Sequence, residues 1–222
     1  MIVTPLRVTA AGDRTRLIAR SGHTFQAPGV FPGCRIIAMV ETTTTDNALW
    51  TATLGRVRGE LANLPATERI WFAVQVARIG SLQEDLDRLF GAIGGPELCA
   101  TCLGGCCGGA KHHATLTNLL GYLLDGEEPP SPDFSRTCPF LGSGGCRLSA
   151  ACRPFNCIIF LCEALDGRLT DEQRQLFVHT ECQLRAAYEA VAALCPGASL
   201  RGLLLAAARV GDRPLLPGSV SR

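Results

Sequence analysis

A dense group of cysteines in the middle of the chain constrains its fold more than any other feature. Nine of the twelve cysteines fall between residues 99 and 162. The first four form the pattern Cys99-x2-Cys102-x3-Cys106-Cys107, with glycine pairs between and after them. A metal centre needs several soft ligands that converge from separate turns. The pattern therefore predicts an irregular, cysteine-rich centre around which the rest of the chain folds.

Composition limits the classes of protein to which the chain can belong. Its 222 residues are 47% hydrophobic and 18% charged, which is enough for a packed core. The net charge is +1 and no long basic stretch occurs, so nucleic acid is not expected as a partner. No apolar run approaches the roughly 20 residues that a membrane span requires.

The first residues of the chain indicate the cellular compartment, and with it the redox state expected for the cysteines. The first residues show no charged segment followed by an apolar stretch, so we expect no secretory signal and a cytoplasmic location. The cytosol keeps thiols reduced, and cysteine pairs there more often bind metal or do redox chemistry than form structural disulfides.

The spacing of apolar residues predicts a mainly α fold. Helical periodicity covers residues 46–64, starts again near Thr67, and recurs over 81–93, 116–123, 171–194 and 200–210. Two capping-box patterns, Ser81-x2-Glu84 and Thr170-x2-Gln173, mark expected helix starts.

Residues 1–45 look different and are expected to form a small β-containing extension. Short β-like runs occur at 6–8, 17–19 and 36–40, and the threonine run at 42–45 favours an extended or loop conformation. Residues 46–222 would form one helical domain around the metal motif at 99–162.

The later cysteines complete a recognisable pattern. Cys138 begins the sequence Cys-Pro-Phe-Leu, Cys146 follows, and Arg153-Pro154-x2-Cys157 leads to Cys162. Over residues 99–162 the chain resembles the YkgJ-type cysteine-cluster proteins, also described as a zinc- or iron-chelating domain. The resemblance implies metal binding by eight thiols: Cys99, Cys102, Cys106, Cys107, Cys138, Cys146, Cys157 and Cys162. Cys152 is an additional thiol whose role the sequence leaves open.

Ligand type alone does not choose the metal. Four-cysteine sets suit both zinc and iron–sulfur clusters. The eight thiols could fill two four-coordinate sites, and one four-ligand cluster with four structural or second-site cysteines fits equally well. Adjacent Cys106 and Cys107 are expected to face different sides. Flagellin lysine methylases carry a similar cysteine motif and are thought to hold a four-iron cluster, so the resemblance favours iron–sulfur over zinc.

Three functions remain open, and the sequence does not decide whether the protein is an enzyme. The leading expectation is a 4Fe–4S protein with an electron-transfer or accessory role. The second is a zinc-stapled module that binds an unknown protein partner. The third is an S-adenosylmethionine-dependent methylase-like enzyme, although no glycine-rich loop follows a clear strand.

Other residues near the cysteines have two interpretations each. His112 and His113 could complete a mixed zinc site or lie idle at the surface. The cations at 111, 136, 147 and 153 could balance the thiolates or be solvated loop charges. The glycines at 104, 105, 108, 109, 142, 144 and 145 could adopt positive φ. Cys34, Cys182 and Cys195 are expected to be structural thiols outside the centre.

Overall fold

The computed structural model describes residues 34–102, 105–143, 145–195, 200 and 202–218, with side chains from residue 45 onward. It confirms the mainly α fold, in which the described sheet is a single pair of two-residue strands. No described helix is both long and apolar enough to cross a bilayer. The elements in order are α1 (Cys34–Ala62), α2 (Ala66–Ala92), α3 (Gly95–Thr101), the 3₁₀ helix η1 (Gly105–His112), α4 (Leu116–Leu124), β1 (Leu141–Gly142), β2 (Gly145–Cys146), the 3₁₀ helix η2 (Ala150–Cys152), α5 (Phe155–Ile158), α6 (Glu163–Asp166), α7 (Asp171–Leu194) and α8 (Leu203–Val210).

The long helix α1 begins earlier than the sequence predicted. Residues 36–40, expected to be β-like, and residues 42–45, expected to be extended or a loop, are helical in α1. The run at 36–40 is short and apolar, and such a run occurs both in strands and in buried helices. Its sequence alone therefore does not distinguish the two. The predicted β-like runs at 6–8 and 17–19 lie outside the described residues.

The helix α2 is continuous where the sequence predicted two helices. The capping-box pattern at Ser81 lies in its interior and starts no new element. Gly80 is buried, and a Cβ built on it would lie 3.2 Å from the Cβ of Ala151. Gly80 therefore marks the place where η2 packs closely on α2, and no proline follows it to break the helix.

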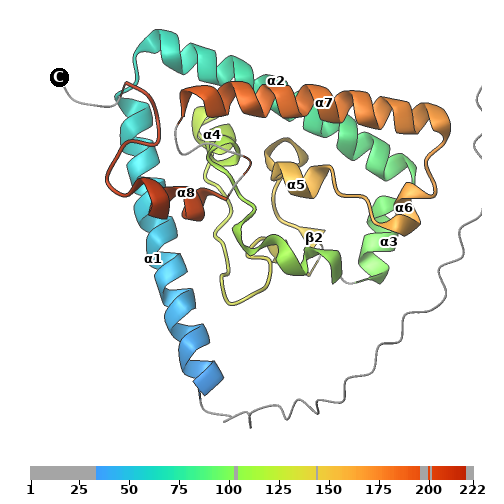
Figure 1. Ribbon diagram of the computed structural model, residues 1–222, viewed down its shortest axis with the longest axis horizontal. Coiled ribbons are helices and arrows are strands. Elements are labelled where there is room, and N and C mark those ends of the chain that lie inside the picture. The colour runs from blue at the N-terminus through green and yellow to red at the C-terminus, as the bar shows by residue number, and fades with distance from the viewer. Residues whose placement is uncertain (1–33, 103–104, 144, 196–199, 201, 219–222) are drawn as a thin grey trace, which may run out of the picture.

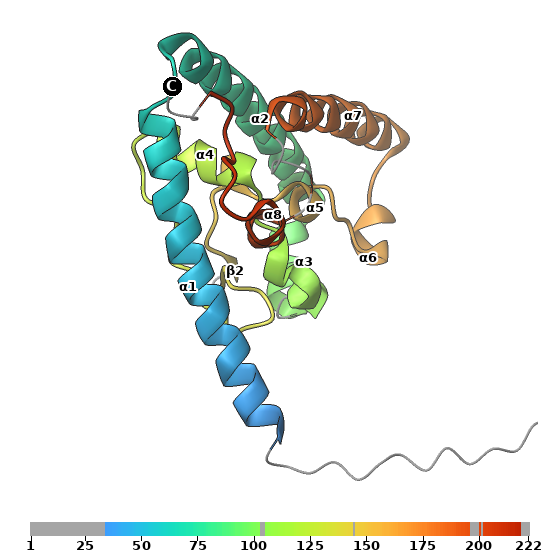
Figure 2. The ribbon, with the colours of Figure 1, turned by 60° about the vertical axis from the view of Figure 1, so that its left-hand side comes forward.

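The helices α2 and α7 lie side by side and antiparallel, and the cysteine-bearing elements lie beneath them (Figure 1). The predicted cap of α7 is confirmed: the Thr170 hydroxyl accepts the Gln173 backbone N–H, and the Gln173 side chain accepts the Thr170 N–H. The predicted helix at 116–123 is α4, capped by Thr115 in the same way. Figure 2 shows the last helix, α8, beside α1.

One apolar core joins the long helices to the cysteine segment. Trp50 of α1 packs edge-on against Phe140 at a ring distance of 5.8 Å, two residues after Cys138. Phe155 of α5 packs edge-on against Tyr188 of α7 at 5.5 Å. Both contacts are buried, so the aromatic side chains fix the cysteine loops against the helical frame.

A close backbone approach at Gly202 yields a first prediction. A Cβ at Gly202 would lie 1.7 Å from the backbone oxygen of His112, so Gly202→Ala must push the start of α8 away from the end of η1. We expect the free energy of unfolding, measured by urea titration, to fall by about 2 kcal/mol. Gly59→Ala is the control, because Gly59 is an exposed residue of α1 with nothing within 4 Å of the added Cβ. That substitution should stabilise the protein by about 0.5–1 kcal/mol. Equal effects of the two variants would contradict the predicted clash.

Candidate metal centre

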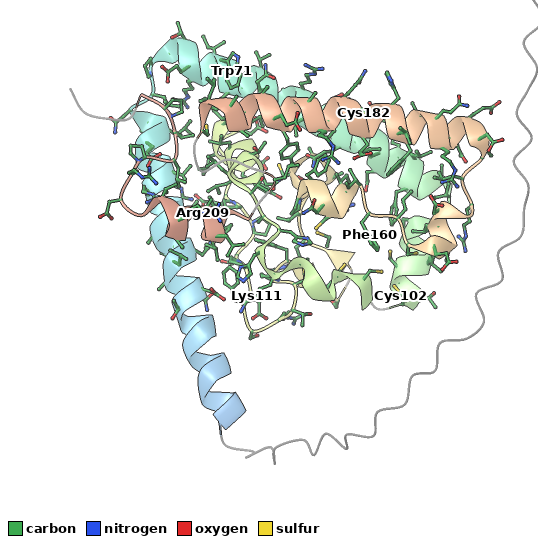
Figure 3. The ribbon with its side chains drawn as sticks, viewed as in Figure 1. Trp71, Cys102, Lys111, Phe160, Cys182 and Arg209 are labelled. Atoms are coloured by element: carbon green, nitrogen blue, oxygen red, sulfur yellow. The ribbon has the colours of Figure 1, made fainter. Side chains whose placement is uncertain are left out.

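Four of the eight candidate cysteines come from consecutive elements at one end of α2. Cys99 lies on α3, and Cys102 is the residue that ends this helix. The Cys102 Sγ donates to the Cys99 backbone oxygen at 3.5 Å, which turns it back along the helix. Cys106 and Cys107 follow on η1. Figure 3 shows Cys102 at the edge of the molecule, on the side opposite to the outer face of α7 that carries Cys182.

The other cysteines come from the irregular segment between α4 and α7. In the short hairpin, Leu141 pairs with Cys146, and the turn includes Gly145 at a φ of 105°. Cys138 precedes β1, and Cys157 lies on the single turn of α5. Cys162 is the residue before α6.

Electrostatic interactions group Cys99, Cys102, Cys106 and Cys162, which we call the first set. Burial is the largest cause that raises the pKa of the Cys99 and Cys106 thiols, and the negative charge of Cys102 is the next cause. The charge of Cys162 raises both pKa values as well. Like charges raise each other's pKa only when they are close. Cys162, at the start of α6, therefore lies near the Cys99-x2-Cys102 turn.

We call the remaining four candidate cysteines the second set: Cys107, Cys138, Cys146 and Cys157. Burial raises the pKa of Cys157 to about 12, and the charges of Cys146, Cys138 and Cys107 add to this effect. Cys107 has a raised pKa because of burial first and the charge of Cys138 second. Cys106 and Cys99 of the first set also raise the pKa of Cys107, so the two sets are neighbours in space.

The Cys-Pro-Phe-Leu sequence has a physical role in the second set. Burial raises the pKa of Cys138, but hydrogen bonds from the backbone N–H groups of Phe140 and Leu141 lower it. Pro139 has no N–H to donate, and the Leu141 N–H donates to the Cys138 backbone oxygen at 3.2 Å. Amide donors of this kind stabilise a thiolate and are typical of the surroundings of metal-bound cysteine.

The side chains as they stand do not close around an ion. Among the described residues, no group of three or more Cys, His, Asp or Glu side chains has the arrangement that would hold a metal. The donors fit a metal centre in type and number, because each set offers four thiols and no disulfide joins any of the described cysteines. Cys102, Cys106 and Cys146 are exposed, so their side chains have room to turn toward a bound metal.

The nearby cations have defined partners. Lys111 Nζ lies 2.8 Å from Asp46 Oδ2 and joins η1 to α1. Arg153 Nη1 lies 2.6 Å from Asp87 Oδ1 of α2, and its charge lowers the pKa of Cys157. The charge of Arg147 likewise lowers the pKa of Cys138. Arg136 pairs with Asp133 in the loop before β1. Two of these four cations therefore act on thiols of the second set.

A buried polar cluster, which the sequence analysis missed, holds the backbone just before Cys157. The Nδ2 of Asn118 donates to the Arg153 backbone oxygen at 2.8 Å and to the Tyr188 hydroxyl at 3.0 Å. The Nε2 of Gln83 donates to the same carbonyl and lies 3.4 Å from the Tyr188 hydroxyl. These three side chains come from α4, α2 and α7 and are almost completely buried. We call Gln83, Asn118 and Tyr188 the carbonyl clamp. No sequence pattern marks it, because it joins three distant helices.

Of His112 and His113, the described hydrogen bonds place only His113 against one of the eight candidate cysteines. The Nδ1 of His113 lies 3.4 Å from the Sγ of Cys157. Burial, followed by the charge of His112, lowers the pKa of His113. The Nδ1 of His112 is buried and has no hydrogen-bond partner in the described structure.

The extra thiols lie outside both sets. Cys152 is buried in the core, and its Sγ would lie 2.8 Å from a Cβ added to Gly121. Cys195 is buried at the end of α7, as a structural thiol should be, whereas Cys182 is exposed on α7. The side chain of Cys34 is outside the described residues.

The expected positive φ values are found at only one of these glycines. Among the described residues of this segment, Gly145 has a positive φ, whereas Gly105, Gly108 and Gly109 belong to η1 and Gly142 belongs to β1. The glycines of η1 thus have the negative φ of a right-handed 3₁₀ helix.

Comparisons with protein-family models, with curated proteins and with solved structures find no match to this chain.

The carbonyl clamp yields a second prediction. Asn118→Ala removes two hydrogen bonds to buried partners and half of the Thr115 cap, so we expect the free energy of unfolding to fall by about 2–3 kcal/mol. Asn63→Ala is a matched control, since Asn63 is exposed and bonds only to the end of its own helix. Its effect should stay within about 0.5 kcal/mol. Chemical denaturation measures both variants, and a similarly small loss for Asn118→Ala would show that the clamp does not hold the fold.

Proposed function

We propose that the protein is a cysteine-ligated metal protein, and that an iron–sulfur protein with an electron-transfer or accessory role is its best description. The proposal is supported by the mutual effects of the thiol charges: Cys102, Cys106 and Cys162 act on Cys99, whereas Cys146, Cys138 and Cys107 act on Cys157. A cubane or a zinc ion takes four cysteine ligands. Each set therefore has the donor number that one centre needs, and the resemblance of residues 99–162 to the YkgJ-type proteins supports the same proposal.

The exposure of the first set supports the electron-transfer role. Cys102 and Cys106 are exposed, and Cys99 and Cys162 are partly exposed. A cluster held there would lie near the surface, which a redox partner must approach in order to exchange electrons. A bound iron–sulfur cluster would supply a reversible one-electron couple whose potential depends on solvent exposure and on hydrogen bonds to sulfur.

The short elements of the cysteine segment favour zinc as the second candidate. Between α4 and α7 the described chain contains only single helical turns and the two-residue strands β1 and β2. A structural metal commonly organises a segment of this kind, and a zinc-stapled module would then present its helices to a protein partner. No observation favours the methylase-like enzyme, and the described residues contain no strand–helix–strand unit for nucleotide binding.

The third prediction concerns which metal the purified protein contains. Protein purified without oxygen should absorb near ~400 nm and contain about four irons and four acid-labile sulfides for each cluster. Iron, zinc and sulfide would be assayed on the same sample. Stoichiometric zinc in a colourless protein would replace the iron–sulfur proposal by the zinc module, and protein without either metal would overturn both.

The division into two sets is the fourth prediction. Cys102→Ser removes a ligand of the first set and Cys157→Ser removes one of the second, so each should lose about half of the bound metal. Cys182→Ser should lose none, because Cys182 is exposed on α7 and belongs to neither set. Metal analysis and the absorption spectrum measure all three variants. Complete loss of metal in both ligand variants would indicate one shared centre, and full retention in either would remove that cysteine from the ligands.

A further inference from the structure

A cavity of about 280 Å³ lies at the corner where α1 ends, α2 begins and the loop after α4 passes. Figure 1 shows α1 and α2 meeting at this corner. Cys99 and Cys102 follow the opposite end of α2, and no cysteine is among the described residues that line the cavity. The cavity is therefore separate from the candidate metal centre.

Two arginines and two glutamates line this cavity: Arg58, Arg69, Glu127 and Glu128. Arg58 of α1 forms an ion pair with Glu128, which joins the helix to the loop. The loop is also held to α4, because the Glu127 N–H donates to the Tyr122 oxygen at 2.8 Å and Gly126 turns the chain at a φ of 75°. Backbone hydrogen bonding thus fixes the place of Glu127 beside the cavity.

The other two charges line the same cavity without pairing. Among the residues that the structure describes, the Arg69 guanidinium and the Glu127 carboxylate have no hydrogen bond and no ion pair. The wall also has apolar parts, from Leu61, which is buried, and from Ala62 and Leu123. An apolar wall with a few fixed polar groups is the usual construction of a small-molecule site.

The charges decide which class of small molecule suits the cavity. A guanidinium binds a carboxylate through two parallel N–H donors, and a carboxylate accepts from an ammonium group. A ligand with a single charge would satisfy either Arg69 or Glu127 and leave the other without a partner. The volume is just below the ~300 Å³ at which pockets for drug-sized ligands begin. A small molecule that carries both charges therefore fits best.

We propose that this cavity binds a free α-amino acid with an apolar side chain. Its carboxylate lies on Arg69, its ammonium group lies on Glu127, and its side chain packs against Leu61 and Leu123. This binding needs no metal and is a further activity beside the proposed function.

The test is calorimetric titration of the full-length protein with L-leucine. Leucinamide lacks the carboxylate and 4-methylpentanoate lacks the amine, so each should bind about tenfold more weakly than L-leucine. Arg69→Gln should weaken L-leucine by a similar factor and bind L-leucine and leucinamide equally. Glu127→Gln should likewise bind L-leucine and 4-methylpentanoate equally. Each variant thus loses discrimination at one end of the ligand only.

Matched controls come from exposed charges outside the cavity. Arg78→Gln on α2 and Glu189→Gln on α7 should leave the affinity for L-leucine unchanged. Arg69 and Glu127 are exposed as well, so their variants should keep the wild-type midpoint in a urea titration.

Three results would overturn the proposal. They are no saturable binding of L-leucine, L-valine or L-alanine, equal binding of L-leucine and 4-methylpentanoate to the wild-type protein, and an equal loss of affinity in the control variants. The second result would make the cavity a simple anion site. None of them bears on the proposed function, which the metal analysis decides: protein without metal that still binds L-leucine would overturn the metal proposal and support this one.

Discussion

The backbone oxygen of Arg153 is the point at which the helical frame and the cysteine segment are joined. Two amide donors, from Gln83 of α2 and Asn118 of α4, meet at this single acceptor, and the Tyr188 hydroxyl of α7 lies between them. All three side chains are almost completely buried. A buried polar group that loses its partner costs about 1–3 kcal/mol, so removing any member leaves others unsatisfied. Such a cluster restricts the three helices to arrangements in which these hydrogen bonds are kept.

The residues after this carbonyl form a hydrogen-bonded turn that fixes the backbone of Cys157. Proline at 154 fixes φ, and its carbonyl accepts the N–H groups of Cys157 and Ile158, which makes the single turn of α5. The side chain of Arg153 adds an ion pair with Asp87 on α2. The Arg-Pro-x-x-Cys sequence thus has a physical reason at each named position: one residue binds the frame, one begins the turn and one presents the thiol.

Much of the helical architecture could be predicted from local sequence, and the assembly of the site could not. Helical periodicity identifies α4, and the capping box at Thr170 identifies the start of α7, because a cap is a contact within four residues. The same local rule fails at Ser81, since packing of η2 against Gly80 decides there. The expectation that Cys106 and Cys107 face different sides rests on their adjacency in the sequence alone. That Cys162 joins Cys99, whereas Cys157 joins Cys138, depends on α5 and α6 docking beneath α7, and no short pattern encodes that.

The electrostatics of the two sets explain why a cation suits this arrangement. Burial and the charges of neighbouring thiolates raise the pKa of Cys99, Cys107 and Cys157, so a positive charge beside them would stabilise their thiolate forms. The second set is fixed on one side by the carbonyl clamp and has amide, imidazole and arginine groups around its sulfurs. The first set lies at the exposed end of α2, held by the short helices α3 and α6. The first set is thus the more exposed of the two, and the second set is the one tied to the helical frame.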